Sequence, residues 1–297
     1  MSEESETKGS TCSSCQSESC SAKQQKPDET LEQFRERQQL QEKLCKIKHK
    51  FLVLSGKGGV GKSTVAVNIA VALARQGRQV GLLDIDIHGP NIPKMLGVEG
   101  RKIGGTEKSL YPYPYSDNLK LMSISFLLQS QDTAVIWRGP LKMGVIKQFL
   151  KDVEWGELDY LIVDAPPGTG DEPLSICQLI EDADGAVIVT TPQEVAVLDV
   201  RKSITFCRQV RMKIAGVIEN MSGLACPHCD REINLFGKGG GEKMAKELGA
   251  PFLGSVPIDP RVVEGGDKGV PIVIDSPDSP TARAFVAIAD KLAKTGG

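Results

Sequence analysis

Hydrophobic residues from position 51 onward are grouped in short, nearly continuous runs, and longer amphipathic stretches separate these runs. Seven runs share this form: FLVLS at 51–55, QVGLLD at 79–84, LKLMSI at 119–124, DYLIVD at 159–164, DGAVIVTT at 184–191, KIAGVIE at 213–219 and PFLGSVP at 251–257. Strands that are buried on both faces have this composition, and helical stretches lie between them here. The pattern predicts a doubly wound, mostly parallel α/β sheet with helices on both faces.

The N-terminal part of the chain has a different pattern. Residues 1–28 are rich in Ser, Glu, Lys and Gln and contain almost no large apolar side chains, so we expect disorder there without a metal. A charged helix with a partial apolar face is predicted from Glu29 to Lys48. We therefore divide the chain into a flexible Cys-containing leader with a connector helix, 1–49, and one domain, 50–297. Within that domain, 97–117 contains Gly and Pro and is predicted to be a long surface excursion.

Overall composition narrows the possible partners only slightly. The 297 residues are 40% apolar and 25% charged, with a net charge of -2, which provides no general attraction to nucleic acid or membrane. No apolar run approaches the roughly 18–20 residues of a membrane-spanning helix, and the acidic N-terminus lacks the apolar segment of a signal peptide. We expect a cytoplasmic protein that binds neither nucleic acid nor membrane.

A glycine-rich loop follows the first predicted strand. Residues 56–63, GKGGVGKS, fit the pattern G-x-x-x-x-G-K-S/T between a strand and a helix, which is the setting that a phosphate-binding P-loop requires. Glycines let backbone N–H groups surround phosphate oxygens at the helix N-terminus. We expect Lys62 to reach the β- and γ-phosphates and the Ser63 hydroxyl to ligate Mg²⁺.

Carboxylates lie at the ends of two other predicted strands. Asp164 ends YLIVD and precedes a Gly-containing loop that can follow a γ-phosphate, so this acid is expected near the metal. The spacing of Asp84 and Asp86 puts both on one side of an extended chain. One of them can meet Mg²⁺ while the other orients or deprotonates water. The alternative is that one only caps the next helix or turn.

Five of the eight cysteines suggest metal chemistry, because a reducing compartment disfavours disulfides. Cys226 and Cys229 form a C-x-x-C, which can bind one metal or two atoms of one cluster, and this motif alone is ambiguous. No second C-x-x-C follows at zinc-ribbon spacing, so one chain does not close a four-thiolate site. Two-fold symmetry would supply the missing pair for one bridging 4Fe-4S cluster. Cys177 and Cys207 lie in apolar helical patterns and are expected to be buried thiols.

Several motifs together resemble one known family. KGGVGKST resembles the deviant Walker A of the MinD/ParA/nitrogenase-iron-protein class, whose extra lysine, here Lys57, crosses a dimer interface to the partner's nucleotide. DIDIHGPN, WRGP, DAPPGTGDEP, ENMSG and CPHC resemble the Mrp/ApbC branch of iron-sulfur cluster carrier ATPases, from about Lys50 to the C-terminus. The resemblance implies an ATP-dependent homodimer that takes a 4Fe-4S cluster from a donor, holds it on Cys226 and Cys229 of both subunits, and transfers it to apo-proteins.

The resemblance also implies a role for individual residues. Catalysis is assigned to Lys57, Lys62 and Asp86, and Mg²⁺ binding to Ser63, Asp84 and Asp164. ATP binding is assigned to Gly58, Gly59, Val60, Gly61, Lys62, Ser63, Thr64, Asn220, Pro257 and Asp259. Of these, Asn220 has an amide that offers a donor and an acceptor to adenine, although it can also be a turn residue that ends a strand.

The leader sequence TCSSCQSESC resembles the cysteine-bearing N-terminal extension of eukaryotic cytosolic cluster scaffolds. That pattern has four cysteines, whereas Cys12, Cys15 and Cys20 are three. A second cluster would therefore need Cys45, a water or the partner chain as its fourth ligand. The alternative is a flexible tail with adventitious metal affinity. Zinc is a further possible occupant of a four-thiolate site in aerobically prepared protein.

Two other functions remain open at this stage. One is a spatial-partitioning ATPase, for which the amphipathic C-terminal stretch TARAFVAIADKLAK at 281–294 would bind a membrane instead of packing on the sheet. The other is an electron-transfer ATPase similar to the nitrogenase iron protein, which also uses a bridged cluster.

Overall fold

The computed structural model describes residue 25 and residues 29–87, 89–106, 109–127, 139–225 and 231–295. Within these ranges the chain forms a nine-stranded sheet in the order β10-β9-β8-β1-β7-β2-β6-β5, with β11 also paired to β9. The strands are β1 (Ile47–Leu54), β2 (Val80–Asp84), β5 (Tyr113–Ser116), β6 (Leu119–Ser123), β7 (Leu158–Asp164), β8 (Gly185–Thr190), β9 (Ile214–Ala225), β10 (Glu232–Ile233) and β11 (Phe252–Ile258). All seven predicted strands are present, and they pair in parallel.

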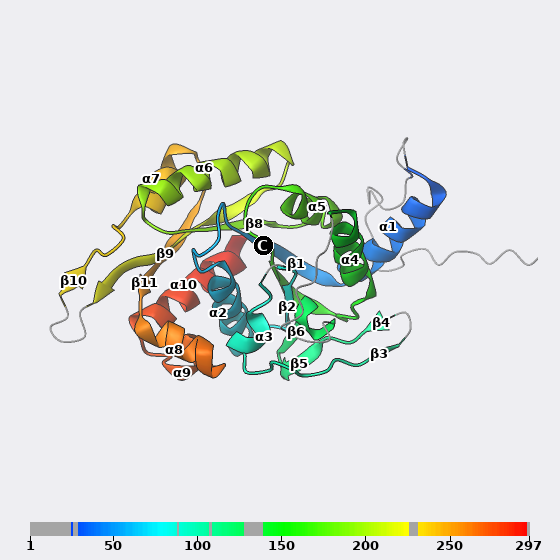
Figure 1. Ribbon diagram of the computed structural model, residues 1–297, viewed down its shortest axis with the longest axis horizontal. Helices are drawn as coiled ribbons and strands as arrows, with labels where there is room; N and C mark the ends of the chain where they lie inside the picture. The colour runs from blue at the N-terminus through cyan, green and yellow to red at the C-terminus, as the bar shows by residue number, and fades with distance from the viewer. Residues whose placement is uncertain are drawn as a thin grey trace, which may run out of the picture.

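Helices cover both faces of this sheet (Figure 1). One face carries α2 (Lys62–Arg75), α3 (Ile92–Met95), α8 (Pro260–Lys268), α9 (Ile272–Asp275) and α10 (Pro280–Thr295). The other carries α1 (Leu31–Leu44), α4 (Gly139–Asp152), α5 (Asp171–Leu179), α6 (Glu194–Gln209) and α7 (Gly240–Glu247). Strand β1 shows how the chain divides between the two cores: Phe51 and Val53 face α2, whereas Leu52 and Leu54 face the opposite layer. The doubly wound fold is confirmed.

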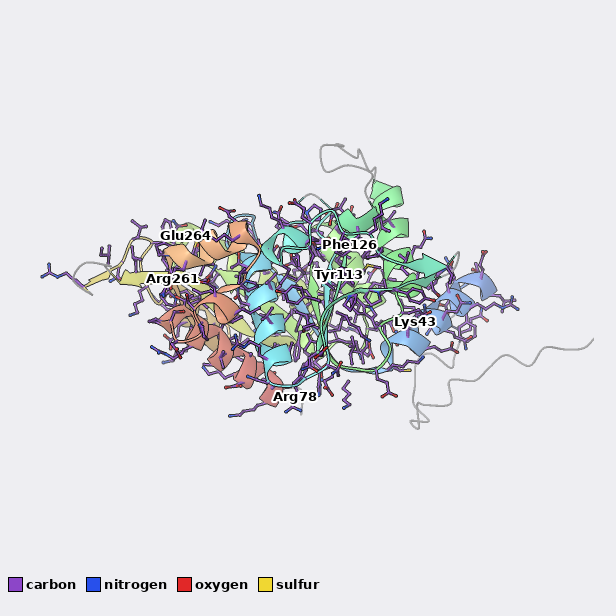
Figure 2. The ribbon with its side chains drawn as sticks, turned by 90° about the horizontal axis from the view of Figure 1, so that it is seen from below. Lys43, Arg78, Tyr113, Phe126, Arg261 and Glu264 are labelled. Atoms are coloured by element: carbon purple, nitrogen blue, oxygen red, sulfur yellow. The ribbon has the colours of Figure 1, made fainter. Side chains whose placement is uncertain are left out.

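The excursion predicted over 97–117 contains more structure than expected. Strand β5 pairs antiparallel with β6 at the edge of the sheet, and β3 (Gly105–Thr106) and β4 (Ser109–Leu110) form a small separate ladder. Pro114 lies between the two tyrosines of β5. A proline is compatible with an edge strand, because the N–H groups on the outer side of such a strand have no partner strand. Tyr113 is anchored beside Phe126 of the short 3-10 helix Ile124–Leu127, with 6.2 Å between ring centroids (Figure 2).

The first helix is shorter than the predicted range of Glu29 to Lys48. It begins after Thr30, whose hydroxyl accepts the Gln33 N–H at 3.2 Å while the Gln33 side chain accepts the Thr30 N–H at 3.0 Å. This capping box satisfies N–H groups that the first turn leaves unpaired. The helix ends at Leu44, because the chain enters β1 three residues later. Figure 2 places Lys43 of this helix and Arg261 of α8 toward opposite ends of the molecule.

The C-terminal helix α10 packs on the sheet. Phe285, Ile288, Ala289 and Leu292 are at most 1% exposed and belong to the core cluster that includes α2. The apolar face that a membrane-binding helix would need is therefore covered by protein. Within the described residues, none of the helices has both the length and the apolar composition needed to cross a bilayer.

The burial of α1 leads to a stability prediction. Leu44 is fully buried in the core cluster that includes α4, whereas Leu31 on the same helix is 67% exposed. We expect Leu44→Ala to lower the free energy of unfolding by about 2–5 kcal/mol, because it leaves a cavity. The matched control Leu31→Ala is expected to change it by less than about 0.5 kcal/mol. Urea unfolding measures both, and equal effects would show that α1 is not part of the core.

Candidate functional site

The P-loop connects β1 to α2 at the carboxyl edge of the sheet. Gly59 and Gly61 have φ angles of 79° and 81°, in the left-handed region that favours glycine. Gly61 also has a neighbour that excludes any side chain, since a Cβ there would lie 2.2 Å from Nδ2 of Asn220. Both the conformation and the close approach therefore require glycine at the N-cap of α2.

Two P-loop side chains meet the acid that ends β7. The Lys62 ammonium donates to Oδ1 of Asp164 at 2.7 Å, and the Ser63 hydroxyl donates to Oδ2 of the same carboxylate at 2.5 Å. Lys62 also lies 3.4 Å from the Asp86 carboxylate. These contacts form because β1, β7 and β2 are neighbours and parallel, so their carboxyl ends share one edge.

Asp84 behaves differently from its predicted partner Asp86. It is fully buried opposite Asp164, accepts the Ser123 hydroxyl at 2.8 Å and accepts the Asp86 backbone N–H at 3.2 Å. Burial, together with the neighbouring Asp164 charge, raises the pKa of Asp84 to about 8. Burial also raises the pKa of Asp164, whereas its ion pair and hydrogen bond with Lys62 oppose that rise, so Asp164 is the acid of the two that pairs with Lys62. The hydrogen bonds of Asp84 are therefore to Ser123 and to the backbone of the turn that carries Asp86.

A polar cavity of about 350 Å³ lies in front of the P-loop. Its lining includes most of the predicted phosphate-binding residues together with Asp86, whereas Asp84 and Asp164 lie behind the lining. The predicted residues that line it are Gly58, Gly59, Gly61, Lys62, Ser63, Thr64 and Asp86. Val60 is buried and lies outside this lining.

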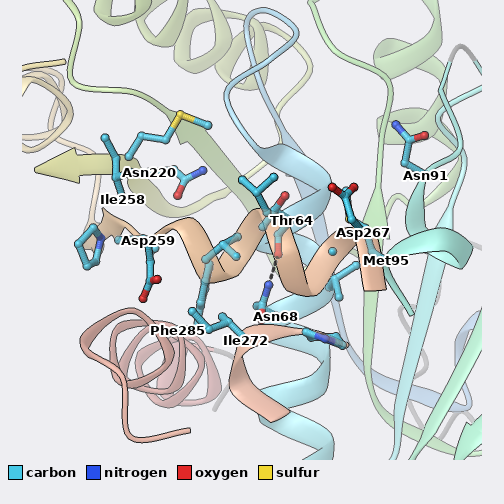
Figure 3. A pocket seen from close by; sticks show the side chains of 18 of the residues that line it. Thr64, Asn68, Asn91, Met95, Asn220, Ile258, Asp259, Asp267, Ile272 and Phe285 are labelled. Atoms are coloured by element: carbon cyan, nitrogen blue, oxygen red, sulfur yellow. Dashed lines mark hydrogen bonds between the residues drawn. The ribbon is translucent and has the colours of Figure 1, made fainter. Parts of the chain in front are cut away.

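A second cavity, of about 550 Å³, adjoins the first and is more apolar. Both cavities are lined by Thr64, Asn91 and Met95, which marks the junction between them. The three predicted adenine-pocket residues, Asn220, Pro257 and Asp259, all line the second cavity. Figure 3 shows Asn220 and Asp259 at one side of it and the α2 residues Thr64 and Asn68 facing them. A polar compartment joined to an apolar one suits a ligand with phosphates and a flat ring.

Asn220 and Asp259 also make hydrogen bonds that stabilise the surrounding backbone. The Asn220 amide donates to the backbone oxygen of Val60 at 2.9 Å, so it connects β9 to the P-loop. Asp259 caps α8 by accepting the Arg261 backbone N–H at 3.1 Å, and it accepts the Arg261 guanidinium at 2.9 and 2.8 Å. Burial alone would raise the pKa of Asp259, but these bonds from Arg261 outweigh it and lower the pKa.

The donor set fits a magnesium ion that arrives with phosphates. In the described part of the chain, no group of three or more His, Cys, Asp or Glu side chains is arranged to hold a metal by itself. Mg²⁺ commonly takes only one or two protein ligands and completes its shell with substrate phosphates and water. The Ser63 hydroxyl lines the polar cavity and supplies an oxygen ligand of this kind, and the Asp164 carboxylate that accepts its hydrogen bond lies behind that lining.

The two P-loop lysines have different surroundings. Lys62 is 6% exposed and pairs with two acids. Lys57 is half-buried, and its ammonium forms no ion pair with any residue that the structure describes. Its backbone oxygen accepts the Ser55 hydroxyl at 2.9 Å, which orders the loop without using the charge.

The cysteines predicted to bind clusters fall mostly outside the described residues; these are Cys12, Cys15, Cys20, Cys226 and Cys229. Cys45 is described: it is half-buried at the end of α1, and its thiol donates to the Glu42 backbone oxygen at 3.2 Å. The whole of β1 separates it from the P-loop, which is roughly 25 Å at about 3.3 Å per residue.

Cys177 and Cys207 are buried, as predicted. Burial raises the pKa of Cys177 to about 11 and that of Cys207 to about 12. Thiols with such pKa values are protonated at neutral pH and neither ligate metal nor react readily.

Sequence reasoning missed several residues of the site. Asn91 and Met95 line both cavities, and Asn91 ends the quoted motif DIDIHGPN, so the motif itself held the signal. Ile272 and Phe285 also line the apolar cavity, about 200 residues after the P-loop in sequence. Only the packing of α9 and α10 against α2 brings them there.

The chain is similar to known proteins over most of its length. The chain is 54% identical over 257 residues to an iron-sulfur cluster carrier protein of Methanocaldococcus jannaschii, covering 86% of this chain and 89% of the relative. It is 53% identical over 255 residues to an iron-sulfur cluster carrier protein of Saccharolobus solfataricus, covering 86% of each.

Solved structures of two nucleotide-bound proteins are similar to this chain. A nucleotide-binding protein of Archaeoglobus fulgidus in complex with ADP is similar with a TM-score of 0.69 and 41% identity, over 78% of this chain and 91% of that one. MinD of Pyrococcus horikoshii, complexed with Mg-ADP, is similar with a TM-score of 0.62 and 27% identity, over 84% and 97%. The family model of the NUBPL iron-transfer P-loop NTPases matches residues 46–293. With this match over most of its length, the chain belongs to the NUBPL iron-transfer P-loop NTPase family.

Proposed function

We propose that this chain is an ATP-dependent carrier that holds a 4Fe-4S cluster between two copies of itself and delivers it to apo-proteins. ATP binding and hydrolysis are supported by one observation. Lys62, Ser63, Asp86 and Asp164 lie together at a polar cavity that continues into an apolar one. Membership of an iron-transfer family, and relatives named as cluster carriers, support the cargo.

Nucleotide binding would use both cavities. The triphosphate would occupy the polar cavity, where the N–H groups of the glycine loop and Lys62 neutralise its charge. The base would occupy the apolar cavity beside Asn220 and Pro257. A bound magnesium ion would neutralise further phosphate charge, with Ser63 and Asp164 as the residues that hold it and Asp84 behind them.

Hydrolysis needs a group that orients water and a group that stabilises the departing phosphate. Asp86 is the acid that lines the polar cavity, so it is the candidate for orienting water. Lys57, whose charge is unpaired by described residues, would reach the partner's nucleotide in the ATP-bound dimer. A cation that arrives only in that dimer acts on the transition state, as an arginine finger does.

The cluster is the cargo, and a dimer is the simplest way to hold it. Each chain contributes Cys226 and Cys229, and a 4Fe-4S cluster takes four thiolates. The described residues on either side of these cysteines belong to one antiparallel ladder, in which Ala225 is paired with Glu232. The residues that flank the cysteine-bearing stretch, Ala225 and Glu232, are therefore neighbours at the end of β9.

The first test compares the two lysines. Lys62→Ala should weaken nucleotide affinity about 10- to 100-fold, because it removes a charged hydrogen bond to bound phosphates. Lys57→Ala should retain nucleotide affinity but slow hydrolysis on the order of 10³-fold. Nucleotide titration and single-turnover hydrolysis measure these effects. Equal loss of affinity in both variants would contradict separate roles.

A mixed dimer decides whether Lys57 acts across the interface. One chain carries Lys57→Ala and the other Lys62→Ala, so only the first chain has a competent P-loop. If Lys57 acts in trans, that P-loop faces the intact Lys57 of the other chain, and turnover per competent site should be near wild-type. If Lys57 acts within its own chain, the site is inactive.

The second test concerns the cargo. Cys226→Ala should abolish the cluster bound after anaerobic reconstitution with iron and sulfide, whereas nucleotide affinity should stay unchanged, because the thiolates and the P-loop are separate sites. The matched control Cys177→Ala removes a buried, protonated thiol and should retain the cluster. Iron per dimer and the visible absorption spectrum are the measurements. A full cluster in Cys226→Ala, or zinc bound in preference to iron without any transfer, would overturn the proposal.

A further inference from the structure

Glu219 is a fully buried acid near the end of β9, and its carboxylate accepts three hydrogen bonds. Oε1 accepts the Ser222 hydroxyl at 2.5 Å and the Gly239 N–H at 2.9 Å. Oε2 accepts the Gly241 N–H at 2.6 Å. A buried carboxylate is costly unless its oxygens are bonded, so this arrangement holds its donors firmly in place.

These donors lie on both sides of the cysteine-bearing stretch. Ser222 precedes Cys226 and Cys229 in the chain, whereas Gly239 and Gly241 follow them at the start of α7. The fit at Gly241 is close, since a Cβ there would lie 3.0 Å from Thr190 Cγ2 and 3.2 Å from Oε2 of Glu219. Glu219 thus joins the two flanks of that stretch to each other and to the sheet.

The next residue along β9 connects the same place to the nucleotide loop. Asn220 donates to the Val60 backbone oxygen at 2.9 Å, and its Nδ2 occupies the space above Gly61. Between Asn220 and Ser222 lies Met221, with φ at 59°, an unfavourable value for a residue with a side chain. Such a conformation persists only where neighbours enforce it. Here Asn220 is held by the P-loop on one side, and Ser222 is held by Glu219 on the other.

We infer that Glu219 is a positioning residue that couples the P-loop to the stretch carrying Cys226 and Cys229. A change in the P-loop on nucleotide binding would shift Asn220 and Met221 through the Asn220–Val60 hydrogen bond. The hydrogen bonds of Glu219 would then shift Ser222 and the Gly239–Gly241 turn, which flank the cysteines. This inference rests on the proposed function, because it assigns the coupling to a cluster-binding pair. It concerns described residues only: Val60, Asn220, Met221, Ser222 and the Gly239–Gly241 turn.

The test uses the full-length, cluster-free chain, so that it has a readout independent of cargo. The alkylation rates of Cys226 and Cys229 are measured by mass spectrometry without nucleotide, with ADP and with a non-hydrolysable ATP analogue. In the wild-type chain these rates should differ between nucleotide states by at least about fivefold, the lower end of the usual range for coupling between sites. In Glu219→Gln the ratio should fall to about one, with nucleotide affinity retained.

The matched control is Glu242→Gln, the same chemical change at an exposed position one residue after Gly241. It should keep the wild-type ratio. A purely structural role of Glu219 would change the alkylation rates equally in all nucleotide states, leaving the ratio unchanged. That result would overturn the inference.

If Glu219→Gln fails to fold, Ser222→Ala decides, because it removes only one of the three donors and should lower the ratio in part. An unchanged ratio in Ser222→Ala would then count against the coupling. Absence of any nucleotide dependence in the wild-type chain would also overturn it. The proposed function is judged separately, by iron bound per dimer, so the two can fail independently.

Discussion

The buried ion pair between Lys62 and Asp164 is the interaction on which the site depends. Lys62 is 6% exposed and Asp164 is fully buried, so each charge has lost most of its contact with water. Separated from each other, either charge would be strongly unfavourable in that position. Paired at 2.7 Å, with Ser63 on the second oxygen, they hold a cation at the edge of a cavity where phosphate charge would enter. Folding therefore places the Lys62 ammonium at the proposed phosphate-binding position before any ligand binds.

The order of the strands makes this pair possible. β1 supplies the P-loop, β7 supplies Asp164 and β2 supplies the Asp84–Asp86 turn, and these three strands lie side by side. Asp84 and Asp164 are directly opposite in that ladder, and two buried carboxylates so close cannot both be ionised at little cost. The conflict raises the pKa of Asp84, whereas Asp164 has Lys62 as a direct partner. The pairing of β2 with β7 brings Asp84 and Asp164 together. It also leaves them with different partners, Ser123 for Asp84 and Lys62 for Asp164.

The sequence predicted the features that depend on local pattern. The seven core strands are nearly continuous apolar runs, and the P-loop is a spaced motif, so neither requires knowledge of distant contacts. Strand β5 was missed because its Tyr-Pro alternation resembles a loop until β6 pairs with it. Phe285 was missed as a cavity residue because only the packing of α10 on α2 brings it to the site. The raised pKa of Asp84 and the three hydrogen bonds to Glu219 likewise arise from burial and from partners that periodicity does not reveal.

The position of Cys45 bears on how many cluster sites ATP can control. The cysteines of the proposed carrier site follow β9 in the chain, and Asn220 connects that strand to the P-loop. Cys45 precedes β1 and lies at the opposite edge, roughly 25 Å from the P-loop along the strand. A second cluster with Cys45 as its ligand would have the length of β1 between it and the nucleotide. The P-loop would then act directly on the Cys226–Cys229 pair alone, and a leader cluster would have to gain or lose its cargo without nucleotide control or through contacts with another chain.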